Sequence, residues 1–401
     1  MSYNNVALAV IPSGIKSSIV YSLIGGNMTF ARGSSATRRN KDGLIEYVDT
    51  SVPRLDYDGA IPHLLLEPSR TNSQTYSEAF NSWSKTNTTV SSNANIAPDG
   101  NTTADLILET TTSGVHSVNV GTYSGLSGTY TYSVFAKYNG RNLQIYSDNT
   151  SRFAARVIFN LQDGTIVQED NGTGKIEAYK DGWYRCSVTG AIGSTSSFTV
   201  ALRSVSGTTT SFAGDVTKGF YAWGAQMENG AYVTSYIPNL TTGSSTRAVE
   251  GAVNASAELN DAEGVLFAEI KTQNLIPDAN AYLGISDNSA TNMLNIRFST
   301  SGLVQIHNNG TGTSNRVYGE TLTSDYIKIA VKYGRATGDY KVFINGEEKT
   351  VFGTFVATVM NGLNTFDLAY PTDTFPFLGM VRQAVVFDSA LTDAQLIELT
   401  R

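Results

Sequence analysis

Thr131-Tyr-Ser-Val-Phe-Ala-Lys-Tyr138 is the stretch that decides the fold class. Tyr132, Val134 and Ala136 alternate with the residues between them, so every second side chain can enter a core while the others face outward. A period of two is typical of a β-strand with one buried face. Both this stretch and residues 326–333 predict half-buried antiparallel strands. The second stretch places four apolar side chains on one face: Ile327, Ile329, Val331 and Tyr333.

Two-residue turns join further strands into hairpins. Asn345-Gly346 joins residues 340–344 to 347–351, and Asp163-Gly164 joins residues 156–162 to 165–169. Asn-Gly and Asp-Gly tolerate the positive φ angles that tight hairpin turns require. Such hairpins argue against a parallel βαβ architecture, so the chain is predicted to be all-β.

The end of the chain predicts one short helix. Thr392 and Gln395 have the spacing of a capping box, in which each side chain satisfies a backbone N–H of the first turn. Leu391 can contact Leu396 across that cap.

Composition limits the classes of partner. The chain has 401 residues, of which 41% are hydrophobic and 16% are charged, so Asn, Ser, Thr and Gly must form much of the surface. Its net charge of -7 argues against nucleic acid, because binding to phosphates needs clustered Lys and Arg. Cys186 is the single cysteine, which excludes an intrachain disulfide. No signal peptide or membrane-inserting segment is expected from the sequence.

Clusters of turn residues divide the chain into three expected parts. The clusters lie at Pro68–Gln74 and Pro238–Thr246. The parts are therefore residues 1–70, 71–245 and 246–401. The first is too small and too poor in apolar clusters to form an independent globule, so it is expected to fold against a neighbour.

Charged side chains of both signs follow one another in residues 1–70. This mixture suits ion pairs between subunits. The alternative is that most of these groups are solvated, because exposed ion pairs contribute little to stability. The basic residues are Arg32, Arg38, Arg39 and Arg54, and the acidic ones are Glu46, Asp49, Asp56 and Asp58.

Three runs near the amino terminus, Phe30–Val48, Pro53–Tyr57 and Leu64–Asn72, resemble the entry segment of bacteriophage virion fibre and tail proteins. In those proteins the segment precedes β-domains similar to carbohydrate-binding modules. The resemblance implies that residues 1–70 form an extended virion-attachment or oligomerisation segment. It also implies a homotrimer, other virion proteins as partners, and a place on the virion exterior after assembly in the host cytoplasm.

The two remaining parts resemble two kinds of β-sandwich. Residues 71–245 are similar to the jelly rolls of family 4/9-type carbohydrate-binding modules through Tyr76–Phe80, Gly182–Arg185, Phe220–Glu228 and Tyr232–Pro238. Residues 246–401 are similar to laminin-G or concanavalin A-like sandwiches through Phe267–Ile270, Tyr340–Gly346, Phe377–Val381 and Val385–Thr392. The fold class implied is an extended segment, then a jelly roll, then a concanavalin-like sandwich.

Catalytic groups are sparse in the sequence. His63, His116 and His307 are the imidazoles available to a hydrolytic triad, and they are expected to be surface or packing residues. Glycoside hydrolysis needs two carboxylates and leaves no sequence motif, so it stays open. The carboxylates considered for it are Glu177, Asp181 and Glu228, whose alternative role is that of turn or edge residues.

Sugar binding needs an aromatic ring to stack on a pyranose and polar groups to bind its hydroxyls. Trp183 and Trp223 lie in strand-like segments and are expected in the core. The expected glycan site is a set of residues that flank the Asn139-Gly140 turn, together with one tryptophan near a loop. The alternative is ordinary strand packing. The site residues are Tyr138, Arg141, Gln144, Tyr146 and Trp83.

The resemblance to jelly-roll modules further implies a structural calcium ion, with Glu78 and Glu228 as its candidate ligands. The function expected from all of these observations is adhesion of a non-enzymatic phage fibre protein to host-surface polysaccharide. Several weak sites on one particle would raise its avidity. Two alternatives stay open: a purely structural decoration or fibre subunit, and a polysaccharide depolymerase.

Overall fold

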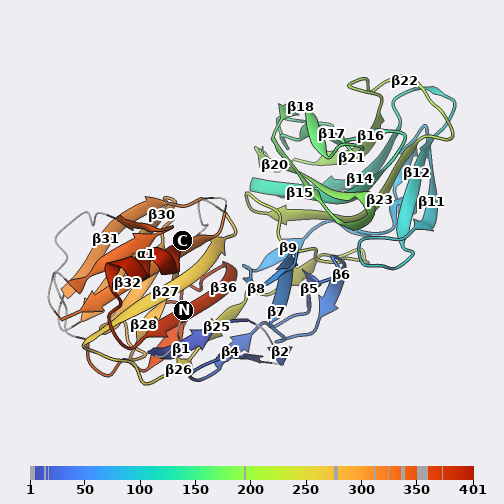
Figure 1. Cartoon of the computed structure of the whole chain (residues 1–401). Helices are drawn as coiled ribbons and strands as arrows, with labels where there is room; N and C mark the ends of the chain where they lie inside the picture. Colours follow the sequence, from blue (N-terminus) through green and yellow to red (C-terminus); the bar gives the residue numbers. More distant parts are fainter. Residues whose placement is uncertain are drawn as a thin grey trace. The chain divides into compact units, whose positions relative to one another are not determined.

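A computed structural model describes residues 5–12, 15–16, 18–193, 196–274, 279–310, 313–323, 325–335, 339–349, 360–372 and 374–401. The fold class predicted from alternation and turns is confirmed, because the chain is nearly all β (Figure 1). It forms two compact units, each described by itself below. The terminal unit comprises Met1–Ser35, Val48–Ser69 and Ala248–Arg401, and the central unit comprises Ala36–Tyr47 and Arg70–Arg247.

The central unit is a sandwich of two six-stranded antiparallel sheets. The β16 sheet has the order β10 (Ser84–Thr86), β14 (Ser117–Tyr123), β21 (Phe198–Val205), β16 (Asn142–Ser147), β17 (Arg156–Asn160) and β18 (Thr165–Asn171). The β15 sheet has the order β11 (Thr88–Asn95), β12 (Ala104–Glu109), β23 (Gly219–Asn229), β15 (Gly128–Asn139), β20 (Trp183–Ile192) and β19 (Thr173–Ala178).

Shorter elements complete the central unit. They are the pairs β5 (Ala36–Arg39) with β6 (Ile45–Val48), β9 (Arg70–Asn72) with β24 (Ser245–Arg247), and β13 (Ser113–Gly114) with β22 (Phe212–Ala213), and two 3₁₀ turns, η1 (Phe80–Ser82) and η2 (Lys180–Gly182).

The core of the central unit follows the predicted alternation. Tyr132, Val134 and Ala136 of β15 point into a buried cluster that they share with Leu143 and Ile145 of β16. Every second residue of each strand enters this layer because successive side chains point to opposite faces. Cys186 of β20 is buried in the same layer, and burial raises the pKa of its thiol.

The terminal unit is a second sandwich. Its β27 sheet has the order β34 (Glu347–Lys349), β33 (Lys341–Ile344), β32 (Ile327–Gly334), β27 (Glu263–Thr272), β36 (Gly379–Phe387), β8 (Ile61–Leu66) and β7 (Arg54–Asp58), with β1 (Val6–Val10) also paired to β36. Its β29 sheet has the order β26 (Ala255–Ser256), β35 (Thr365–Asp367), β28 (Ala281–Ser286), β29 (Met293–Phe298), β30 (Leu303–Gly310) and β31 (Thr313–Thr321). A small sheet joins β2 (Ile15–Lys16), β3 (Ile19–Val20), β4 (Met28–Ala31) and β25 (Gly251–Val253).

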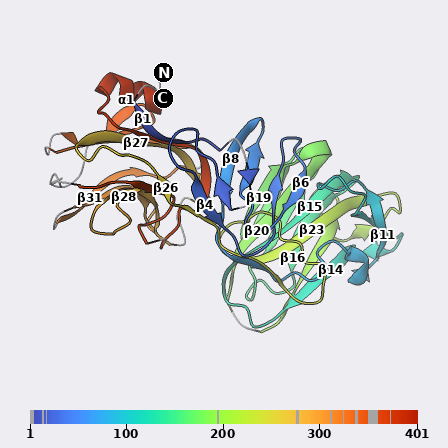
Figure 2. The ribbon, with the colours of Figure 1, turned by 90° about the horizontal axis from the view of Figure 1, so that it is seen from below.

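Helix α1 (Asp393–Thr400) covers the outside of the β27 sheet. Figure 2 shows the helix, the β27 sheet and the β29 sheet as successive layers of this unit. Leu396 of α1 is buried with Val265 and Phe267 of β27. The predicted capping box is confirmed, since the Gln395 N–H donates to Thr392 Oγ1 and the Thr392 N–H donates to Gln395 Oε1.

Both predicted hairpins are present. Asn345 and Gly346 have φ angles of 52° and 86° and join β33 to β34, as the Asn-Gly pair predicts, while residues 350–351 lie outside the described part of the chain. The hairpin at Gly164 differs in its loop. β17 ends at Asn160 rather than Gln162, because the Asn160 side chain accepts hydrogen bonds from the backbone N–H groups of Gln162 and Asp163 and so starts the turn earlier.

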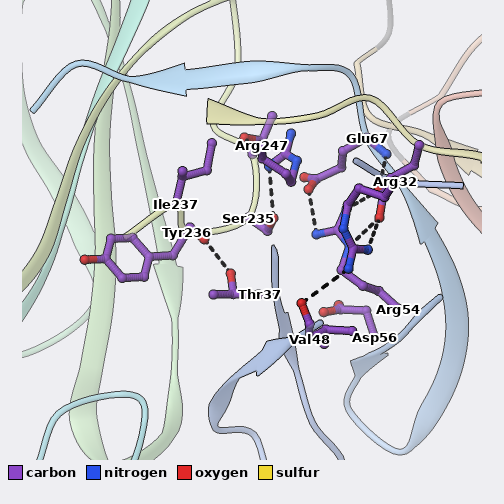
Figure 3. A network of polar contacts seen from close by, with 12 residues as sticks. Arg32, Thr37, Val48, Arg54, Asp56, Glu67, Ser235, Tyr236, Ile237 and Arg247 are labelled. Carbon is purple, nitrogen blue, oxygen red and sulfur yellow. Dashed lines mark hydrogen bonds and ion pairs between the residues drawn. The ribbon is translucent and has the colours of Figure 1, made fainter. Parts of the chain in front are cut away.

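Arg32, Arg54 and Glu67, which lie in the runs that resemble phage proteins, form a buried ionic network with Glu250 in the terminal unit. Glu250 accepts hydrogen bonds from Arg32 Nη1 at 2.8 Å and from Arg54 Nε at 2.8 Å. Its other carboxylate oxygen accepts the Glu67 backbone N–H at 2.8 Å and a further bond from Arg54. Arg54 also pairs with Glu67 at 2.8 Å (Figure 3). The side chains of both arginines and of Glu250 are fully buried.

The prediction of intersubunit pairing is therefore wrong for Arg32 and Arg54. Glu250, the partner that they share, lies 218 and 196 residues away in the same chain, and no local pattern could disclose that pairing. Burial alone would lower the pKa of Arg54, but the Glu250 and Glu67 carboxylates outweigh it and raise that pKa above its ordinary value. Arg38 pairs with Glu46, and the Arg39 guanidinium lies over the Tyr179 ring at 3.9 Å.

Residues 1–70 are shared between the two units rather than separate from them. Residues 36–47 belong to the central unit, where Thr37 Oγ1 donates to the Tyr236 carbonyl at 2.5 Å (Figure 3). The roles of residues 1–70 in virion attachment and oligomerisation stay predictions.

Candidate functional site

The two sheets of the central unit differ in what covers their outer faces. The outer face of the β15 sheet carries Phe135, Trp183 and Trp223, which pack beneath Ile45 and Tyr236 in a second buried cluster. The expectation that both tryptophans are core residues is confirmed. In the described part of the unit, no buried hydrophobic cluster lies on the outer face of the β16 sheet. On that face Tyr146, Arg156 and Arg203 are partly exposed, whereas Gln144 is buried.

Strand β16 presents two of the predicted site residues on this face. Leu143 and Ile145 point into the core. Gln144 and Tyr146 alternate with them along the strand and therefore point outward. Gln144 is directly opposite Arg203 on β21, and Tyr146 is directly opposite Arg156 on β17. The outer face thus combines an amide, a phenol ring and two guanidinium groups on three adjacent strands.

Tyr146 is the centre of this cluster. The Arg203 guanidinium carbon lies 3.2 Å from the centroid of the Tyr146 ring, and that of Arg156 lies 4.8 Å from it. Arg156 Nη2 also donates to Tyr146 Oη at 3.3 Å. Burial lowers the pKa of the Arg203 guanidinium, while Tyr146 opposes this shift and the like charge of Arg156 adds to it.

The other predicted site residues lie elsewhere in the unit. Tyr138 is 39% exposed but belongs to β15, which lies in the other sheet, because the chain passes from one sheet to the other at Gly140. Arg141 forms a bidentate ion pair with buried Glu109: its Nε donates to Glu109 Oε1 at 2.7 Å and its Nη2 donates to Oε2 at 3.2 Å. Trp83 is half-buried against the core and contacts Tyr76 edge-on. The structure brings together Gln144 and Tyr146 but not these three.

Sequence reasoning missed Arg156 and Arg203. Their strands do carry the signal, since Val157 and Phe159, and likewise Val200 and Leu202, are core residues that alternate with outward positions. Alternation assigns a face to each residue, but it does not reveal that β21 and β17 are the neighbours of β16.

A second polar and aromatic group lies on the outer face of the β29 sheet in the terminal unit. Tyr282 contacts Tyr370 edge-on with ring centroids 4.9 Å apart, and Arg297 donates to Gln305 at 2.8 Å. His307 belongs to this group as well. Tyr282 and His307 are only 6% and 4% exposed, so the group is packed and does not form an open face.

The carboxylates considered for hydrolysis do not form a catalytic pair on an open surface. Glu228 is fully buried and accepts hydrogen bonds from Gln226 Nε2 at 2.6 Å and from the Thr234 N–H and Oγ1 at 2.9 and 2.6 Å. Glu177 pairs with Lys175 on β19, and Asp181 is an exposed residue of η2 with a φ of 60°. A polysaccharide cannot reach Glu228 without disrupting this packing.

The two candidate calcium ligands do not fit a calcium site. Both carboxylate oxygens of Glu228 already accept bonds from buried protein donors. Glu78 accepts a hydrogen bond from Tyr236 Oη at 2.9 Å, and burial raises its pKa, which favours the neutral form that binds cations poorly. Among the described residues, no group of three or more His, Cys, Asp or Glu is arranged to hold a metal ion.

Comparisons with known proteins give weak structural likenesses. No protein-family model and no curated protein matches the chain. It is similar to the CBM40 of the Ruminococcus gnavus IT-sialidase bound to α2,3-sialyllactose (18% identity, 37% of this chain and 94% of that chain, TM-score 0.30). It is also similar to domain 4 of AbnA, a GH43 arabinanase from Geobacillus stearothermophilus (17% identity, 43% and 84%, TM-score 0.30). The leech intramolecular trans-sialidase is a third neighbour (15% identity, 37% and 26%, TM-score 0.30).

Because these TM-scores are near 0.30, the fold of this chain is assigned from its own strand pairing and not from these neighbours. Among the helices that the structure describes, none is long and apolar enough to cross a membrane.

Proposed function

We propose that this chain is a non-enzymatic glycan-binding protein whose ligand lies on the outer face of the β16 sheet. One observation carries the proposal: the outward positions of three adjacent strands are filled by an amide, an aromatic ring and two guanidinium groups. These are the groups that hold sugars by hydrogen bonds and ring contacts. The residues of this face are Gln144, Tyr146, Arg156 and Arg203.

The biological setting is a further part of the proposal. The runs between Phe30 and Asn72 resemble phage fibre and tail proteins, which supports a role on the virion exterior in adhesion to host-surface polysaccharide. A homotrimer would carry three copies of each site and so strengthen a weak contact through avidity. Because Arg32 and Arg54 are buried and paired with Glu250 inside the terminal unit, contacts between subunits would use other residues.

Replacing Tyr146 with Ala is expected to weaken glycan binding by about tenfold or more. The ring is in contact with both guanidinium groups, so its loss frees Arg156 and Arg203 to reorient and removes the preorganisation of the face. Binding of the full-length chain to a glycan array, followed by titration with the strongest ligand, measures the change.

Tyr138→Ala is the matched control, since it removes the same ring from a partly exposed position in the other sheet. It should bind like the unmodified chain. An equal loss of glycan affinity in Tyr146→Ala and Tyr138→Ala would contradict the placement of the site. If the unmodified chain bound none of the neutral and acidic glycans tested, the proposed function itself would be contradicted.

A further inference from the structure

Two cationic groups on the outer face of the β16 sheet share one aromatic ring. Strand β16 lies between β21 and β17, so Arg203 and Arg156 approach Tyr146 from opposite neighbouring strands. Contact with the ring restrains both side chains and holds like charges close together. Like charges at such proximity repel, and the repulsion is stronger where burial reduces screening by water.

Neither arginine is paired with a carboxylate in the described part of the chain. Among the residues that the structure describes, no Asp or Glu forms an ion pair with Arg156 or Arg203, whereas Arg141 is paired with Glu109. Burial lowers the pKa of the Arg203 guanidinium, Tyr146 opposes this shift, and the like charge of Arg156 adds to it. Two positive charges therefore lie side by side, and the described residues supply no negative charge that pairs with either of them.

Three polar atoms of this cluster are also unsatisfied. The Nε atoms of Arg156 and Arg203 and Oε1 of Gln144 are buried and have no hydrogen-bond partner within the described chain. Gln144 is only 4% exposed. A buried polar group without a hydrogen-bond partner in the chain can be satisfied by water or by a ligand group.

The charge of the central unit permits an anionic ligand. The acidic excess of the chain resides in the terminal unit, because the central unit has 15 Lys and Arg against 14 Asp and Glu. Guanidinium groups bind carboxylate and sulfate groups through paired, charge-assisted hydrogen bonds. The Tyr146 ring, which already carries a guanidinium at 3.2 Å, is better suited to orienting the arginines than to stacking on an uncharged pyranose.

We propose that Arg156 and Arg203 together bind the carboxylate or sulfate groups of an acidic polysaccharide. This inference rests on the proposed function and narrows it, because it names the class of glycan.

Two pairs of polymers test the inference with the full-length chain: polygalacturonate and its carboxyl-reduced form, and dextran sulfate and dextran. Arg156→Gln and Arg203→Gln each remove one charge and keep a polar side chain. Lys175→Gln is the charge-matched control, because Lys175 is an exposed residue of β19 in the other sheet. Circular dichroism and thermal melting establish that each variant is folded.

The unmodified chain should bind one or both acidic polymers more tightly than the matching neutral polymer, and the affinity should fall as salt is added. Each Arg→Gln variant should lose about tenfold to a hundredfold in affinity, which corresponds to one hydrogen bond to a charged group. Lys175→Gln should change affinity by less than about twofold. Arg203→Lys, which keeps the charge but loses the planar fork, should bind with intermediate affinity.

Equal binding of acidic and neutral polymers, or unchanged affinity in the folded Arg→Gln variants, would overturn the inference and leave glycan binding intact. Failure of the unmodified chain to bind any polymer or any glycan on the array would instead overturn the proposed function.

Discussion

Replacing Glu250 with Gln is expected to destabilise the terminal unit by about 3–5 kcal/mol, because it leaves two buried arginines with too little negative charge. The Glu250 carboxylate accepts bonds from Arg32, from Arg54 and from a backbone N–H, and all three side chains of this network are fully buried. A glutamine there would turn an N–H donor toward other donors. Glu67 would be left as the carboxylate that pairs with Arg54.

Denaturant unfolding followed by circular dichroism measures this loss of stability. If the two units unfold at different denaturant concentrations, each transition is fitted separately. Glu348→Gln is the matched control in the same unit. Its partner Lys341 lies 3.3 Å away in a partly exposed pair, so the change should cost no more than about 1 kcal/mol. A Glu250→Gln variant as stable as the control would contradict the buried network.

Trp223→Ala is expected to destabilise the central unit by about 3–5 kcal/mol, the usual cost of removing a large buried aromatic side chain. Trp223 is fully buried on the outer face of the β15 sheet, where its ring lies 4.7 Å from that of Tyr236 and 5.4 Å from that of Phe135. Its loss would open a cavity beneath the β5–β6 hairpin, which contributes Ile45 to the same cluster.

Trp83→Ala makes the same chemical change at a half-buried position and should cost clearly less. Thermal and denaturant unfolding of the two variants gives the comparison. If Trp223→Ala were no more destabilising than Trp83→Ala, the β15 sheet would not be covered on its outer face, and the reason for placing the ligand on the β16 sheet would fail.

Local patterns predicted much of the fold. Alternation in residues 131–138 and 326–333 identified strands and one buried face of each. The expectation that residues 131–138 form a half-buried strand is wrong, because Phe135 on the opposite face is also fully buried, in the cluster with Trp183 and Trp223. The Asn345-Gly346 turn and the Thr392 cap were also predicted, because the residues that determine them are within a few positions of one another. The Gly164 hairpin has a longer loop than the Asp-Gly pair predicts, because the Asn160 side chain accepts hydrogen bonds from the backbone N–H groups of Gln162 and Asp163.

Long-range partners could not be predicted in this way. Most of the central unit lies between Arg32 or Arg54 and Glu250 in the sequence, so nothing near these arginines indicates a partner in the same chain. At the candidate site the same limit applied to Arg156 and Arg203. Their outward direction could be read from the sequence, but the strand order β21–β16–β17 could not.

Grouping by proximity in sequence also misled the site prediction. Tyr138 and Tyr146 flank one turn, yet that turn connects the two sheets, so the residues belong to different layers of the sandwich. The pairs that matter are cross-strand neighbours, such as Tyr146 with Arg156.

The central claim is that this chain holds an acidic polysaccharide without altering it. The most direct measurement incubates the full-length chain with polygalacturonate and follows bound polymer, polymer length and newly formed reducing ends in the same sample. The predicted result is that polygalacturonate binds saturably, keeps its length and gains no new reducing ends. Shortening of the polymer with release of reducing ends, or no retention of polymer at any protein concentration, would contradict the claim.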